Sequence, residues 1–132
     1  MYEKIHASFA RQGLMKTLGA RLVRVESARV DIELPWSEAV TQQHGYFHAA
    51  ATTAIADTAG GYAALTLMQP DEEVLAVEFK VNLLRPATGS RLIAEAAVVR
   101  AGKTLVICET KVKNDAEELV ALMVQTNFRV RG

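Results

Sequence analysis

Apolar and polar residues alternate in the first third of the chain, and this alternation predicts two strands. From Val30 to Leu34 every second residue is apolar and the residues between them are acidic, so we expect a half-buried strand that ends at Pro35. Residues 20–26 alternate less regularly and should pair with that strand in a hairpin. Ahead of them, a helical spacing of apolar residues predicts a short helix over residues 2–17.

From His48 to Met68 the alternation disappears, and Ala, Leu and Ile dominate. A segment of this length is too long for a strand and is predicted to be a helix. Gly60 and Gly61 should weaken that helix. Their presence indicates the close approach of another element, either a sheet wrapped tightly around the helix or a partner helix across a dimer axis.

Alternation returns at residues 76–83, and turn signals at roughly ten-residue spacing separate three further strands from it, so we expect four strands in an antiparallel meander. The order of elements then predicts an α+β fold, an antiparallel sheet wrapped around one long central helix, as a single domain of residues 1–132. Because such a sheet covers one side of the helix well and leaves the other, dimerisation is expected. The four strands are predicted over residues 76–83, 91–100, 104–113 and 119–130.

The composition excludes several classes of protein. Lys and Arg number 15, as do Asp and Glu, so the chain as a whole has no attraction to nucleic acid or to an anionic membrane. The single cysteine, Cys108, excludes a disulfide framework within the chain and is expected to be a small core residue. The first 13 residues lack the apolar run of a signal peptide, and residues 40–69 are too polar for a transmembrane helix. A cytoplasmic protein is therefore predicted.

Asp57 is the one formally charged residue between Ala39 and Pro70 when His is counted as neutral. With no Lys or Arg beside it in the sequence, its carboxylate is either held by hydrogen-bond donors elsewhere in the fold or used for chemistry. The first alternative places it at a dimer seam, capped by Thr hydroxyls or backbone groups. The three His show no metal-site spacing with carboxylates, so no metal is expected.

Together with the order of the elements, QQHGYFHAAATTAIADTAGGYAA (residues 42–64) resembles the hotdog-fold acyl-CoA thioesterases, and more narrowly their phenylacetic-acid-degradation (PaaI-like) branch. That branch has a His at the start of the central helix and an acidic residue nine positions later, often within ADTA. His48 and Asp57 have this spacing (57 − 48 = 9), and residues 56–59 have the sequence ADTA. Gly45 lies three residues before His48, as the family pattern asks.

The resemblance implies a hydrolase that cleaves an acyl-CoA thioester to a free acid and CoA. It implies that Asp57 is the general base or the nucleophile, and that the N–H of Ala49, helped by Ala50, stabilises the oxyanion at the start of the helix. The Gln42 amide would hold the attacking water or the carboxylate. His48 either orients the loop or takes part in catalysis.

Two departures from the family pattern affect this site. Ala49-Ala50 stands where the family has Gly-Gly, which adds methyl groups where the substrate comes very near the backbone. Gln42 stands where Asn is usual. A Ser or Thr that some relatives carry on the strand opposite the acid falls near Ala76, so that auxiliary role is expected to be absent.

The resemblance extends to NLLRPA (residues 82–87) and to RAGKT (residues 100–104), which are similar to a strand ending and a later hairpin turn of the family. Arg100 and Lys103, on either side of Gly102, are candidates to meet the CoA phosphates. An ordinary hairpin with solvated basic residues explains them equally well. CoA enters as part of the substrate, and no cofactor is implied. The predicted substrate-binding residues are Gly45, Ala50, Asn82, Arg100, Gly102 and Lys103.

Nine residues of helix span roughly 13–14 Å at about 1.5 Å per residue, so His48 and Asp57 of one chain are too far apart to act on one atom. In the family, the acid of one subunit faces the helix start of another, which implies a homodimer with two shared sites. A tetramer made of two such dimers is the larger alternative. Two other functions stay open: a non-catalytic acyl-CoA-binding hotdog protein, and a hotdog dehydratase or hydratase.

Overall fold

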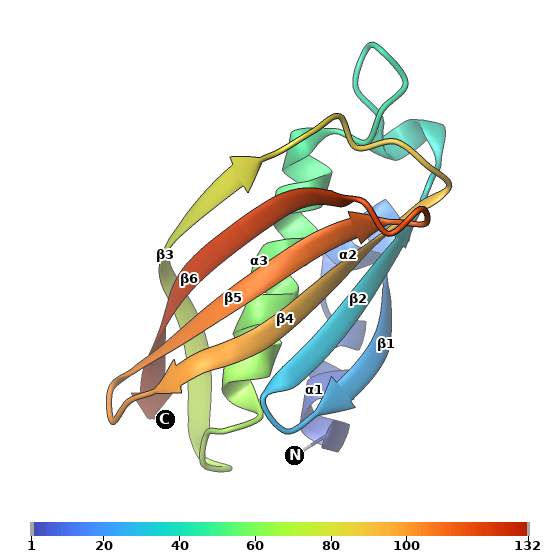
Figure 1. The fold of residues 1–132 in the computed structure, drawn as a ribbon. Helices are drawn as coiled ribbons and strands as arrows, with labels where there is room; N and C mark the ends of the chain where they lie inside the picture. Colours follow the sequence, from blue (N-terminus) through green and yellow to red (C-terminus); the bar gives the residue numbers. More distant parts are fainter. Residues whose placement is uncertain (1, 132) are drawn as a thin grey trace.

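Six antiparallel strands form one curved sheet, and the long helix α3 packs against one face of it (Figure 1). The computed structural model describes residues 2–131, and none of the helices in this range has the length and apolarity to cross a membrane. This arrangement confirms the predicted α+β hotdog fold. In chain order the elements are α1 (Tyr2–Ala10), α2 (Gly13–Leu18), β1 (Arg21–Glu26), β2 (Arg29–Pro35), the 3-10 turn η1 (Glu38–Val40), α3 (Ala49–Leu65), β3 (Glu72–Leu83), β4 (Arg91–Ala101), β5 (Leu105–Asn114) and β6 (Leu119–Arg131).

The strands lie in the order β1-β2-β4-β5-β6-β3. The predicted hairpin of β1 and β2 is confirmed, but the predicted four-strand meander is wrong, because β3 pairs with β6 and not with β4. The cause is the connection 84–90, which does not form a tight turn. Its Leu84 N–H donates to Val120 O (2.9 Å), and its Ala87 O accepts from the Phe47 N–H (3.0 Å). These bonds lead the chain across the end of the sheet, so that β4 begins beside β2.

The single helix predicted at the N-terminus is also wrong in detail, since α1 and α2 are separated at Arg11 and Gln12. Gln12 has an extended backbone (φ −78°, ψ 107°), and its Nε2 donates to the Tyr62 hydroxyl oxygen at 2.8 Å. The same hydroxyl is hydrogen-bonded to Ser8 Oγ at 2.8 Å. The break therefore lets α1 and the start of α2 hold one polar group of α3.

Small residues of α3 allow the sheet to approach the helix very closely. Ala56, Ala59 and Ala63 are fully buried. At Gly60 the approach is closer still, because a Cβ at this position would collide with the side chain of Gln125 on β6. The close approach predicted at the glycine pair is thus confirmed for Gly60, and the approaching element is the sheet.

Away from the sheet, α3 and the edge strand β3 leave surface uncovered. A Cβ on Gly61 would meet nothing within 4 Å. Along β3 the side chains of Leu75, Val77, Phe79 and Leu83 are between 45% and 59% exposed. An edge strand with exposed apolar side chains is a surface that proteins ordinarily cover.

Candidate active site

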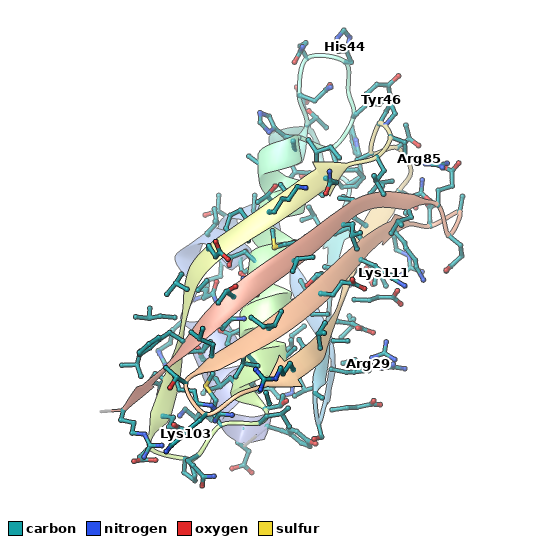
Figure 2. The ribbon with its side chains drawn as sticks, turned by 60° about the vertical axis from the view of Figure 1, so that its left-hand side comes forward. Arg29, His44, Tyr46, Arg85, Lys103 and Lys111 are labelled. Carbon is teal, nitrogen blue, oxygen red and sulfur yellow. The ribbon has the colours of Figure 1, made fainter. Side chains whose placement is uncertain are left out.

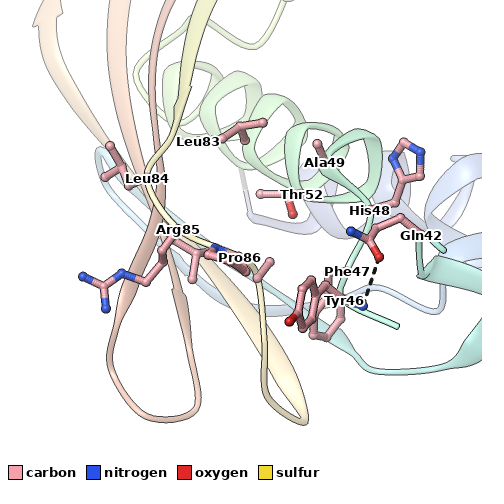
Figure 3. A pocket seen from close by; sticks show the side chains of 12 residues that line it. Gln42, Tyr46, Phe47, His48, Ala49, Thr52, Leu83, Leu84, Arg85 and Pro86 are labelled. Carbon is pink, nitrogen blue, oxygen red and sulfur yellow. Dashed lines mark hydrogen bonds between the residues drawn. The ribbon is translucent and has the colours of Figure 1, made fainter. Parts of the chain in front are cut away.

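A pocket of about 570 Å³ opens between the N-terminus of α3 and the connection from β3 to β4 (Figure 3). Its walls are mainly apolar, and polar groups enter it from the loop before α3 and from the helix. Three of the four predicted catalytic residues, Gln42, His48 and Ala49, line this pocket, whereas the fourth, Asp57, does not.

The loop before α3 is held in shape by Gln42. Its backbone N–H donates to Tyr46 O (2.9 Å), and its side-chain Oε1 accepts from the N–H groups of His44 (2.5 Å) and Tyr46 (3.4 Å; Figure 3). Gly45 permits the turn, because its φ of 81° lies in the left-handed region that favours glycine. The loop thus occupies the oxygen of the Gln42 amide, while Nε2 makes no hydrogen bond within residues 2–131 and can donate to a ligand.

His48 caps the N-terminus of α3. Its Nδ1 accepts a hydrogen bond from the Ala50 N–H at 2.9 Å, and its carbonyl oxygen accepts from the N–H groups of Ala51 and Thr52. The N–H of Ala49 has no acceptor among the described residues and lies at the positive end of the helix dipole. Ala49 is therefore the free donor at this terminus. The Ala50 N–H, predicted as a second oxyanion donor, is already bound to His48, which fits an orienting role for that side chain.

Asp57 lies about two turns further along α3 and lines a different hollow, of about 200 Å³, between α3 and β3. Gln125 donates its Nε2 to Asp57 Oδ1 (2.6 Å) and to the Asp57 backbone oxygen (3.1 Å). Burial raises the pKa of Asp57 above its ordinary value, and the hydrogen bond from Gln125 opposes that rise. The carboxylate of Asp57 is therefore partly desolvated, and no Lys or Arg contributes to its pKa.

One chain therefore holds both halves of the predicted site but keeps them apart. Ala49 and Asp57 are eight residues apart, which corresponds to about 12 Å along the helix axis at roughly 1.5 Å per residue. A thioester whose carbonyl oxygen meets the Ala49 N–H is out of reach of Asp57 in the same chain.

The predicted CoA-phosphate residues lie on the turn between β4 and β5, at the end of the molecule opposite the loop before α3 (Figure 2). Gly102 closes this turn by donating its N–H to Leu105 O at 2.8 Å, and Arg129 Nε donates to Gly102 O at 3.0 Å. Arg100 and Lys103 are exposed. In a single chain these residues are not brought to the pocket.

Of the NLLRPA segment (residues 82–87), Arg85 lines the pocket and Asn82 does not. Asn82 is exposed on the edge strand, paired with Leu122, and does not line the pocket. Arg85 does line it, and its guanidinium forms an ion pair with Glu118 at 2.9 Å. Arg85 is thus the one Lys or Arg among the described residues that line the pocket.

Sequence reasoning missed Gln125, which the structure places directly on the Asp57 carboxylate. The signal was present in the alternation of strand 119–130. Met123, Gln125 and Asn127 occupy successive inward positions, and all three are fully buried. Two consecutive inward amides need internal hydrogen-bond partners, so they indicated a polar partner on the helix that the sheet covers.

Neither thiol nor metal chemistry is supported by the arrangement of the described residues. Cys108 is fully buried on β5, and burial raises the pKa of its thiol to about 12, which fits the predicted core role. Residues 2–131 contain no cluster of three or more His, Cys, Asp or Glu side chains suited to a metal ion. The absence of a metal from the reaction remains a prediction.

Comparisons with known proteins agree with this fold. The family model of the thioesterase superfamily matches residues 44–121. The crystal structure of a thioesterase family protein from Silicibacter pomeroyi is 42% identical, with a TM-score of 0.95 over 99% of this chain and 98% of that chain. The fold is also that of the PaaI protein from the phenylacetic acid degradation operon of E. coli (22% identity, TM-score 0.90, 99% of this chain and 94% of that chain).

Two further relatives bear on the chemistry. The 1,4-dihydroxy-2-naphthoyl-CoA hydrolase of Listeria monocytogenes is 29% identical over 110 residues, which are 83% of this chain and 89% of that protein. The protein SAV0944 of Staphylococcus aureus is 28% identical, with a TM-score of 0.85 over 90% of this chain and 99% of that chain. It has been solved with one Glu and, separately, with one Gln replaced by Ala, at positions 15 residues apart.

Proposed function

Because this chain belongs to the thioesterase superfamily and is a thioester hydrolase, we propose that it cleaves acyl-CoA thioesters to a free acid and CoA. The observation that carries this proposal is a mainly apolar pocket lined by two residues with free donors, Ala49 with its backbone N–H at the start of α3 and Gln42 with its amide nitrogen. A thioester carbonyl needs such donors at the point where negative charge develops on its oxygen.

In the proposed reaction the carbonyl oxygen accepts from the Ala49 N–H, at the positive end of the helix dipole. The Gln42 Nε2 then orients the attacking water or the carboxylate that activates it. His48 keeps the helix start in shape through its bond to Ala50. These donors are fixed by the loop and the cap before substrate arrives, so they need little reorganisation as charge grows.

Asp57 supplies the other half of the reaction. As a general base it takes a proton from water while the water oxygen attacks the carbonyl carbon, and the thiolate of CoA leaves. As a nucleophile its own oxygen attacks the carbonyl carbon, the C–S bond breaks and the thiolate of CoA leaves, and water then hydrolyses the resulting anhydride to the free acid and the Asp57 carboxylate. Both routes need an ionised and poorly hydrated carboxylate. Burial of Asp57 supplies the poor hydration and raises its pKa, and the hydrogen bond from Gln125 favours the ionised form against that rise.

The variants of SAV0944 support the same pair of residues. The replaced Gln and Glu of that protein lie 15 residues apart. Gln42 and Asp57 have the same separation here (57 − 42 = 15). We infer that an amide before the helix and a carboxylate within it form one functional pair in both proteins.

We propose that the complete site forms between two copies of the chain, with Ala49 and Gln42 from one and Asp57 from the other. The separation of about 12 Å within one helix and the exposed apolar edge of β3 both support a homodimer. Two dimers pairing to a tetramer would leave these shared sites intact. Light scattering that finds a stable, active monomer would contradict the shared site.

The substrate follows from the pocket and from the relatives. The apolar walls, which include Phe47, Leu83 and Pro86, suit an apolar acyl group, and the Listeria relative is named as a hydrolase of an aromatic acyl-CoA. Arg100 and Lys103 would reach CoA phosphates from a neighbouring copy.

We expect residues 1–132 to act as one cytoplasmic domain that needs no metal or cofactor and binds neither nucleic acid nor membrane.

The test is a free-thiol assay with a panel of aromatic and aliphatic acyl-CoAs. We expect release of CoA from at least one member, and no turnover with the corresponding free acids. Binding of acyl-CoA without thiol release would favour a non-catalytic acyl-CoA-binding protein. Formation or loss of a double bond in the acyl chain, with the thioester intact, would favour a dehydratase or hydratase.

A further inference from the structure

The Gln125 side chain makes a contact with Asp57 that the proposed reaction does not yet use. Gln125 is fully buried on β6 and reaches from the sheet to the helix. Its Nε2 donates to both Asp57 Oδ1 (2.6 Å) and the Asp57 backbone oxygen (3.1 Å). One amide nitrogen therefore ties the side chain of Asp57 to its own main chain, which restricts the rotation of the carboxylate.

The direction of these hydrogen bonds is fixed by chemistry. A carboxylate and a carbonyl can only accept, so the NH₂ end of the Gln125 amide must face Asp57. The other end, Oε1, accepts from Asn127 Nδ2 at 3.2 Å, and Asn127 is itself fully buried. A flipped Gln125 would set its oxygen against the Asp57 oxygens and its nitrogen against the Asn127 NH₂. The two amides thus form a chain of donors that ends on Asp57.

Gly60 makes room for this chain. A Cβ on Gly60 would collide first with Gln125 Oε1, so an alanine at this position would displace the amide. Glycine destabilises the interior of a helix relative to alanine. A glycine at position 60, three residues after Asp57, is explained by the space that Gln125 needs in order to reach the carboxylate.

We propose that Gln125 is the positioning residue of Asp57, holding Oδ1 so that Oδ2 is presented to water or to the thioester. Asn127 and Gly60 in turn hold Gln125 in place. This inference rests on the proposed function, in which Asp57 is the base or the nucleophile. Within residues 2–131 Oδ2 receives no hydrogen bond, so it is the oxygen left for chemistry.

The surroundings leave the ionised state of Asp57 dependent on this contact. Tyr62 is the other titratable side chain at the hollow. The elements that face Asp57 contribute uncharged residues: Val74, Leu75 and Ala76 from β3, Gln125 from β6, and Gln12 from the segment between α1 and α2. With no cation nearby, the hydrogen bond from Gln125 is what favours the carboxylate against burial.

The direct test is Gln125→Met, which keeps the size of the side chain and removes the donor. We expect kcat/KM at neutral pH to fall about 10- to 100-fold, the range for losing a group that orients a catalytic residue. The acid limb of the pH–rate profile should move to higher pH, because the ionised Asp57 has lost its donor, and part of the activity should return as the pH rises. Gly60→Ala should move the limb the same way with Gln125 still present.

The matched control is Thr110→Val, which removes a buried hydroxyl that donates to Ala56 O at 3.5 Å and does not touch Asp57. We expect the acid limb of this variant to stay where the wild type has it. An unmoved limb in both Gln125→Met and Gly60→Ala, with activity lost only in proportion to stability, would make Gln125 a structural residue and overturn the proposal.

A second readout separates this inference from the proposed function. The carboxyl carbon of Asp57 can be titrated by ¹³C NMR whether or not the protein turns over an acyl-CoA. It should titrate at higher pH in Gln125→Met, or in Gly60→Ala if the Met variant does not fold, than in the wild type. An unchanged titration overturns the positioning role, whereas a wild type without thioesterase activity and a shifted titration overturns only the proposed function.

Discussion

Asp57 on α3 and Glu72 at the start of β3 are both carboxylates withdrawn from water, yet their partners differ in kind. Glu72 is fully buried. Its Oε1 accepts from the Gln69 N–H (2.7 Å) and pairs with Arg129 (3.2 Å), and its Oε2 pairs with Arg131 (3.3 Å). Asp57 has a single amide and no cation.

The two environments move the two pKa values in opposite directions. The hydrogen bond from the Gln69 backbone and the two arginines lower the pKa of Glu72, whereas burial raises that of Asp57. Arg129 also donates to Leu67 O and Gly102 O, so the Glu72 cluster joins the end of α3 to the β4–β5 turn. A neutralised carboxylate holds elements together, while one left without a cation remains available for reaction.

The largest expected effect is that of Asp57→Asn on activity. The substitution keeps the shape and removes the base, so turnover of the best acyl-CoA should fall by roughly 10²–10⁴-fold. The fold should be at least as stable at neutral pH, because a raised pKa means that the ionised carboxylate opposes folding above that pKa. Steady-state kinetics and urea unfolding measure the two effects, with the exposed Asp71→Asn as the control. A folded dimer of Asp57→Asn with near-normal turnover would end the catalytic interpretation.

Glu72→Gln should show the reverse pattern, a loss of stability. It leaves Arg129, whose side chain is 13% exposed, without a counter-charge, so the urea midpoint should fall clearly at pH 7. A lowered pKa contributes stability above the ordinary glutamate value, and this is lost as the pH falls through the folded value. The difference between variant and wild type should therefore shrink below about pH 4.5.

The control for Glu72 is its neighbour Glu73→Gln. The Glu73 side chain pairs with Lys4 (3.0 Å) and is 64% exposed. This variant should change the urea midpoint little. Equal midpoints for the two variants at pH 7 would show that the Glu72 cluster is not the structural partner described above.

A smaller effect tests whether the Glu72 end of the molecule also binds substrate. Replacing Arg100 and Lys103 together by Ala should raise KM for acyl-CoA several-fold, because two cations facing phosphates are lost. KM for a short thioester without the nucleotide should hardly change. The control is the double replacement of Arg29 and Lys111, which removes the same charge from the outer face of the sheet (Figure 2). Equal effects on both substrates would show that Arg100 and Lys103 are solvated residues of an ordinary hairpin and do not bind phosphates.

The smallest effect is expected at Gly61, which shares the hollow of Asp57. In a single chain a Cβ there meets nothing within 4 Å, so Gly61→Ala alone should favour the helix by about 0.5–1 kcal/mol. At the proposed seam the same methyl group should meet the partner and weaken the dimer several-fold. Sedimentation across a range of concentrations measures this, and a more stable variant with unchanged dimerisation would place the seam elsewhere.

Several features could be predicted from the sequence because they depend on local patterns. Period-2 alternation identified the first three strands, since side-chain direction follows from backbone geometry. Turn signals between apolar runs identified the last three, and a long apolar run without alternation identified α3. The spacing of His48 and Asp57 identified the residues at the helix start and within it. Pro35 marked the end of β2, because proline cannot continue the hydrogen-bonding pattern of a sheet.

Other features depend on contacts between residues far apart in the chain. The pairing of β3 with β6 is set by where the connection 84–90 is anchored, and no alternation specifies that. The break at Gln12 is stabilised by the Tyr62 hydroxyl, 50 residues away. A local pattern carries no information about such partners.

The sequence by itself thus determined the α+β hotdog fold, the long central helix with Asp57 as its one charge, and the absence of any Lys or Arg near Asp57 along the chain. Only the tertiary structure decided that a buried amide on β6 holds that carboxylate, that Gly60 is small because of it, and that Ala49 keeps a free N–H while Ala50 does not. The reason is physical: alternation and spacing fix which way a side chain points, whereas its hydrogen-bond partner and its desolvation depend on which strand the fold brings opposite it.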